Sequence, residues 1–99
     1  MPSLESKKNY SSVEAHLLFD KLLTFINKSS YSILKKRDLA NLIIATKNLA
    51  KNSFELTLSI PFNSPQTVNF LLKSNNSDSQ SLKNELIKVI REFNDFIIN

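Results

Sequence analysis

The sequence contains no glycine in 99 residues. A chain of average composition and this length would contain about seven. Glycine supplies the backbone conformations of phosphate-binding loops, dinucleotide-binding turns and the strained turn that carries a nucleophilic serine. The sequence also lacks cysteine, which excludes disulfides, thiolate metal sites and cysteine nucleophiles. These two absences favour a binding protein over an enzyme.

Length and charge predict one small basic domain. Apolar residues make up 41% of the chain, enough for one core. We expect residues 1–10 to form a flexible N-terminal arm and residues 11–99 to form a single domain. Residues 1–51 contain nine basic and four acidic residues, a net charge of +5, whereas residues 52–99 contain four and five, a net charge of −1. With no signal peptide or apolar span visible, the sequence predicts an intracellular protein of the cytoplasm or nucleus, away from membranes.

Helical periodicity predicts the first two elements. Ser11 and Glu14 have the spacing of a capping box, and apolar residues then recur at helical spacing to about Lys28. A second helix is predicted from the cap residue Asp38 to about Lys51, because Leu39, Leu42, Ile43, Thr46, Leu49 and Ala50 share one helical face. Residues 31–34 between them form a possible short extra strand.

The period changes to two at Phe54. Apolar and polar residues alternate over 54–60 and again over 68–72, on either side of a turn at 61–66, which predicts a β-hairpin. A third helix is predicted from Leu82 to the C-terminus by a stripe of apolar residues. The predicted class is therefore α+β, with three helices and a hairpin in the order α-α-β-β-α.

Candidate catalytic groups are few. His16 is the one histidine, and Asp20 lies one helical turn after it; with no second histidine and no cysteine, the pair is interpreted as a solvent-exposed contact. Glu92 and Asp95 lie on the polar side of the last helix, where a buried acid–base pair is not expected. We therefore expect no catalytic residue, metal site, cofactor or small-molecule substrate.

Two features favour binding to a protein. A two-stranded sheet has two open edges that can pair with another chain. Aliphatic residues also fall on faces otherwise assigned to solvent. The partner-binding candidates are Leu17, Ile44, Leu71, Ile87 and Ile98. The sequence thus predicts a non-catalytic interaction module, a small subunit or adaptor of a larger complex or a homodimer.

The alternative is nucleic-acid binding. Lys36, Arg37, Lys47 and Lys51 share one side of the predicted second helix. A basic strip of this kind can contact phosphates. No aromatic residue is interleaved with these charges, so stacking on single-stranded bases is not predicted.

Overall fold

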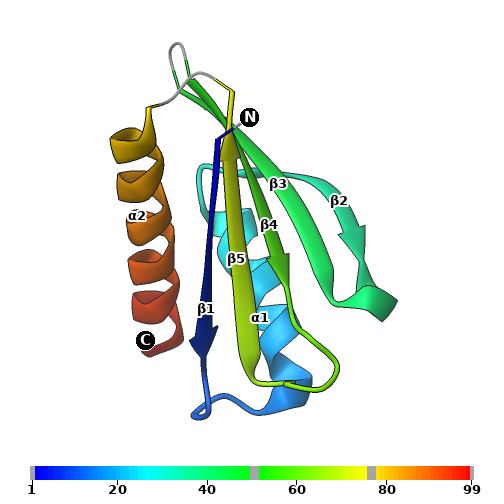
Figure 1. Ribbon diagram of the computed structural model, residues 1–99. Helices are drawn as coiled ribbons and strands as arrows, with labels where there is room; N and C mark the ends of the chain where they lie inside the picture. The colour runs from blue at the N-terminus through cyan, green and yellow to red at the C-terminus, as the bar shows by residue number, and fades with distance from the viewer. Residues whose placement is uncertain (1, 50–51, 76–77, 99) are drawn as a thin grey trace.

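The framework of the protein, in its computed structural model, is a five-stranded antiparallel sheet with two α-helices against one face (Figure 1). The structure describes residues 2–49, 52–75 and 78–98. The elements are β1 (Ser3–Asn9), α1 (Ala15–Lys28), β2 (Ser32–Arg37), the 3-10 turn η1 (Asp38–Ala40), β3 (Leu42–Leu49), β4 (Asn52–Ser59), β5 (Thr67–Ser74) and α2 (Ser79–Ile98). The strand order is β1-β5-β4-β3-β2, so the first strand lies beside the last.

This architecture corrects the predicted one. The class is α+β, but the order is β-α-β-β-β-β-α, and the described residues contain two α-helices rather than three. The hairpin predicted from the alternation is present as β4 and β5, with Leu56 opposite Leu72 and Leu58 opposite Phe70. It forms the centre of the sheet, because β1 and β3 pair with its two outer sides.

The predicted second helix is wrong. Residues 32–49 form β2, a 3-10 turn and β3, which pair antiparallel. The turn closes at Asn41, whose φ of 50° lies in the left-handed region. Asparagine tolerates this conformation better than most residues, and so serves here where glycine is often found. The side chains of Ile43, Ala45 and Lys47 point to the helix side, giving this strand the period of two.

The N-terminal segment is part of the sheet. Residues 3–9, expected within a flexible arm, pair with β5 from Ser3 opposite Lys73 to Asn9 opposite Thr67. Tyr10 then turns into the core and donates its hydroxyl to Asn94 Oδ1 of α2 (2.7 Å). Strand β1 is therefore one of the two edge strands of the sheet, and it lies next to α2.

Both helices cover the same face of the sheet. In Figure 1, α1 lies behind the strands and α2 runs alongside β1 in the same direction. Phe93 of α2 is fully buried. The centroid of its ring lies 5.1 Å from that of Tyr10 and 5.3 Å from that of Phe25 of α1. Burying one such side chain contributes roughly 1.5–3 kcal/mol. The predicted capping box is not formed, since α1 begins at Ala15 and Glu14 makes no side-chain cap.

Candidate protein-binding surface

Strand β1 is an edge strand, and half of its backbone groups point outward. The amide of Tyr10 donates to the Gln66 carbonyl (2.7 Å), and the amide of Ser74 donates to the Pro2 carbonyl (3.2 Å). Hydrogen-bonded pairs alternate along an antiparallel ladder. The even-numbered residues of β1 therefore direct their N–H and C=O groups to β5, and the odd-numbered residues direct theirs away from the sheet. Within the described ranges no strand lies on that side.

The two sheet edges differ in their suitability for pairing. The β1 register is continuous over its whole length. The β2 register shifts between Ile33 and Lys35, and this strand ends in Lys35, Lys36 and Arg37. A bulge interrupts the row of outward backbone groups and so opposes edge pairing. Charge does not distinguish the two edges, because β1 also contains three charged residues, Glu5, Lys7 and Lys8. The edge available to another strand is therefore β1.

A groove of about 580 Å³ runs between the outer side of β1 and helix α2. Its apolar lining consists of Leu4 on the strand and Leu86, Ile87 and Ile90 on the helix. Ile87 is 43% exposed, which is high for an aliphatic side chain beside a core. A strand added to β1 would place every second side chain into this groove.

The groove carries an excess of positive charge. Lys8, Lys83 and Arg91 line it. Glu5 also lines it, as an edge residue whose register position is on the opposite face of the sheet. Lys83 and Arg91 are eight residues apart on α2, which corresponds to about 12 Å at 1.5 Å per residue. The apolar lining therefore lies between two basic positions.

The opposite face of the sheet carries no helix among the described residues. Lys35, Ile44, Thr57, Leu71 and Glu5 lie side by side across its five strands. Ile44 and Leu71 thus flank Thr57, and both are half-buried. These two predicted partner-binding residues therefore share one face of the sheet, two strands apart, and Ile44 lies on a strand rather than on the expected helix.

The other predicted partner-binding residues lie on the helices, away from that row. Leu17 on α1 is 40% exposed and lines a depression with Phe96. Ile98, near the end of α2, lines a depression together with Asn9 at the end of β1. Ile87 is the one that lies in the groove next to the β1 edge.

The predicted basic strip does not form, because its helix does not exist. Lys36 lies near Asp38 (Nζ to Oδ1, 3.6 Å), on the side of β2 opposite to Arg37. Lys47 is buried on the helix side of β3. Lys51 lies outside the described residues.

A buried polar cluster contains Lys47. Its Nζ lies 2.5 Å from Glu85 Oε2 on α2, and Tyr31 donates its hydroxyl to the same oxygen (2.7 Å). The ring centroids of Tyr31 and Phe54 lie 4.9 and 5.8 Å from Lys47 Nζ. Burial, with the Glu85 carboxylate as a further cause, raises the pKa of Tyr31 well above its usual value. All three polar side chains are buried, so the cluster is not accessible to a substrate.

From the sequence, His16 was considered for catalysis and interpreted as solvent-exposed. His16 is exposed, and its Nε2 lies 3.4 Å from Glu14 Oε2. In the part of the chain that the structure describes, no three histidine, cysteine, aspartate or glutamate side chains are grouped as metal ligands would be.

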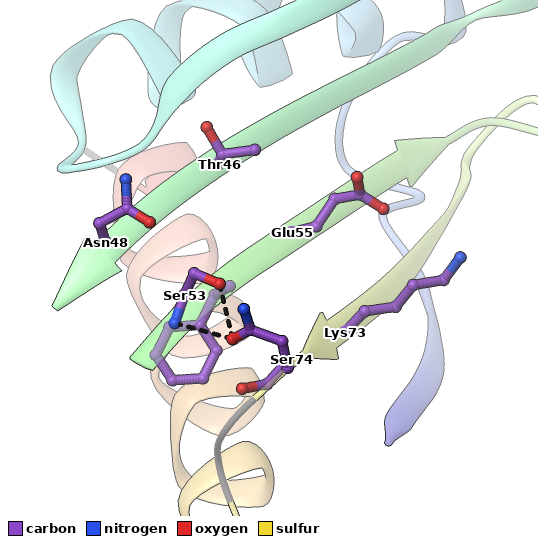
Figure 2. Close-up of a pocket in the computed structure, with 8 residues that line it drawn as sticks. Thr46, Asn48, Ser53, Glu55, Lys73 and Ser74 are labelled. Atoms are coloured by element: carbon purple, nitrogen blue, oxygen red, sulfur yellow. Dashed lines mark hydrogen bonds between the residues drawn. The ribbon is translucent and has the colours of Figure 1, made fainter. Parts of the chain in front are cut away.

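A polar depression of about 380 Å³ lies near one end of the sheet, where β3, β4 and β5 meet (Figure 2). Ser53 donates its hydroxyl to Asn75 Oδ1 (2.7 Å) at its rim. Thr46, Glu55 and Lys73 come from neighbouring strands and lie across its floor. No side chain here has the environment of an activated nucleophile, so the depression indicates no particular chemistry.

No family model matches the chain, and no curated protein matches it significantly. Over the residues described, no helix is long and apolar enough to cross a membrane.

Sequence reasoning missed most of the groove. Leu4 and Lys8 belong to a segment whose inward positions include one apolar residue, so no alternation marks it as a strand. Lys83 and Arg91 have the ordinary exposed pattern of an amphipathic helix. Ile87 is the one groove residue that the sequence predicts as a partner-binding candidate, because an aliphatic residue stands out on a polar helix face.

Proposed function

We propose that the protein is a non-catalytic interaction module, a small subunit or adaptor that binds an extended segment of another protein along β1. The observation that carries the proposal is the outward row of N–H and C=O groups on an unbroken edge strand. Strand addition satisfies such groups through main-chain hydrogen bonds and reads alternate side chains in adjacent pockets. The groove beside β1 supplies such a pocket.

A second copy of the chain fits this edge less well. Two β1 strands can pair antiparallel about Ser6, which places each Glu5 opposite a Lys7. The same pairing would bring together two grooves that each contain Lys8, Lys83 and Arg91. Like charges close together oppose association. Another chain is therefore the favoured partner over a homodimer.

The test uses a neutral extended peptide, TQTITQT, titrated into the labelled protein and followed by NMR. We expect shift changes in β1 and at Ile87. Lys7→Pro removes an outward N–H, which the partner needs, and leaves the ladder to β5 intact. Lys7→Ala is the matched control.

The variants separate the outcomes. Binding should be lost in Lys7→Pro and retained in Lys7→Ala. Binding that survives Lys7→Pro, or shift changes confined to other surfaces, would contradict strand addition. Sedimentation of the free protein as a concentration-dependent dimer that Lys7→Pro abolishes would make the partner a second copy.

As a second candidate function, we propose nucleic-acid binding by the uncovered face of the sheet. Lys7, Lys35, Arg37 and Lys73 lie on that face by register. The observation that favours it is the smaller number of acidic residues there, namely Glu5 and Glu55. Phosphate contacts release counterions, so binding to duplex DNA should weaken steeply with salt and in Lys35→Glu/Arg37→Glu. Salt-independent binding, or none at low salt, would exclude it.

A further inference from the structure

We infer that the segment bound along β1 presents an aliphatic side chain flanked on the same side by two acidic side chains. This inference rests on the proposed function and names the chemistry of the partner. It follows from the composition of the groove and from its dimensions.

The first step is the order of groups along the groove. Helix α2 runs in the same direction as β1 (Figure 1), and Tyr10, just after β1, is bonded to Asn94 (2.7 Å). Arg91 therefore lies toward the Lys8 end of the strand, and Lys83 lies toward the Leu4 end. Ile87, midway between them on α2, lines the groove and is partly exposed.

The second step compares two repeats. The rise of about 12 Å between Lys83 and Arg91 follows from their spacing on the helix. Two residues of a strand span about 6.8 Å, so residues four apart on a bound strand are about 13.6 Å apart and point to the same side. A strand of the pattern acid-x-aliphatic-x-acid therefore places its outer carboxylates near the two basic groups and its central side chain near Ile87.

The third step is charge. Lys8, Lys83 and Arg91 face the groove with Glu5 as the acidic residue that lines it. A bound segment with basic side chains on the groove side would be repelled by these like charges. A segment with acidic side chains there would form ion pairs with the lysine ammonium and arginine guanidinium groups. Charge complementarity of this kind selects partners more than it adds affinity. The alternate positions, which face the uncovered side of the sheet, need only favour an extended backbone.

The experiment compares four peptides of one length by NMR titration at low salt: TETITET, the neutral TQTITQT, the basic TKTITKT, and ETTITTE. The last has the composition of the first but places its acids on the side opposite to isoleucine. We expect TETITET to bind at least about five-fold more tightly than TQTITQT, as two partly exposed ion pairs allow. TKTITKT and ETTITTE should bind more weakly than TETITET, and the preferences should shrink as salt is raised.

Variants of α2 assign the preference to the groove. Lys83→Gln and Arg91→Gln should each reduce the ratio between TETITET and TQTITQT, and the double variant should abolish it. Lys88→Gln makes the same change of charge at an exposed position of the same helix that lines a different depression, beside Phe25 and Lys28. It should leave the ratio unchanged.

The outcomes separate the inference from the function. Equal binding of TETITET and TQTITQT, lost in Lys7→Pro, overturns the acidic pattern and leaves strand addition standing. Failure of every peptide to bind, or binding that survives Lys7→Pro, overturns both. An oligothymidylate serves as the competing probe. If it binds more tightly than TETITET and shifts the signals of Lys83 and Arg91, the inference is overturned in favour of a nucleic-acid partner.

Discussion

Lys47 Nζ lies 2.5 Å from Glu85 Oε2, and the two side chains are 4% and 8% exposed. Tyr31 donates to the same carboxylate oxygen, so strand β3, helix α2 and the segment before β2 meet at one atom. The next two residues of α2 after Glu85 are Leu86 and Ile87, which line the groove beside β1. The buried pair therefore holds the part of α2 that forms the proposed binding surface.

Removing either partner of this pair should destabilise the fold strongly. Glu85→Ala leaves a buried ammonium without its carboxylate, and such changes cost about 3–5 kcal/mol. A domain of this kind has a total stability of about 5–15 kcal/mol, so the loss is a large fraction of it. Urea unfolding should show the loss in both Glu85→Ala and Lys47→Ala.

The double variant Lys47→Met/Glu85→Leu separates pairing from packing. It removes both charges and keeps apolar volume, so it should lose less stability than either single alanine variant. Lys36→Ala, which breaks the exposed contact with Asp38, is the control and should change stability by about 0–1 kcal/mol. A double variant as unstable as the sum of the two single variants would show that the pair is not energetically coupled.

Stability should fall at alkaline pH through the tyrosines. Burial raises the pKa of Tyr10 from 10.0 to about 12, and the pKa of Tyr31 is also raised. Because the folded pKa exceeds the unfolded one, this contribution is complete below about pH 10 and is lost as pH rises through the folded pKa. The chain has two tyrosines. Tyrosinate absorbance should therefore stay low near pH 10 and appear at higher pH, together with unfolding.

Replacing each tyrosine tests whether the tyrosines cause the loss of stability at alkaline pH. In Tyr10→Phe and Tyr31→Phe, the free energy of unfolding should depend less on pH between 10 and 12. The hydroxyl of Tyr10 bonds to Asn94, so Tyr10→Phe should also cost about 1 kcal/mol near neutral pH. Titration of both phenols at pH 10 in the folded protein would contradict the assignment.

The elements that could be predicted are those whose inward positions are mostly apolar. Helix α1 and the β4–β5 pair each place apolar residues at nearly every core-facing position, so their periods are visible. Strand β3 hides its period, because Lys47 occupies an inward position and Ile44 an outward one. The run of residues 42–46 then fits a helix and a strand equally well.

Strand β1 was invisible for a related reason. Leu4 is its single inward apolar residue, and the other inward positions are Ser6 and Lys8. Its place is fixed by the long-range pairing with β5, which no local pattern encodes. The sequence therefore predicts Ile87 as a binding residue but not the groove that it lines, because that groove forms only when β1 is in the sheet.

The stability that Asp78 gives to the start of α2 should be lost in acid. Asp78 Oδ1 accepts a hydrogen bond from the Ser81 amide (2.7 Å), and this bond lowers the pKa of Asp78 below 3.8. Because the folded pKa is depressed, the contribution is present above pH 3.8 and is lost as pH falls through the folded value. Asp78→Ala should speed amide exchange at Ser81, whereas Asp78→Asn keeps an acceptor and should change it less. Equal exchange in the two variants would exclude a capping role.

Amide exchange along β1 offers a direct test of the edge geometry in the free protein. The Leu4, Ser6 and Lys8 amides face β5, whereas those of Glu5 and Lys7 face away from the sheet. Exchange should therefore alternate, with slow amides at even positions and fast ones at odd positions, as measured by NMR in deuterated buffer. Uniformly slow exchange at low protein concentration would mean that the outward groups already have partners, and uniformly fast exchange would mean that β1 is not held in the sheet. Either pattern would remove the basis for strand addition, whereas alternation that becomes uniform protection on adding TETITET is the result expected of a strand docked on this edge.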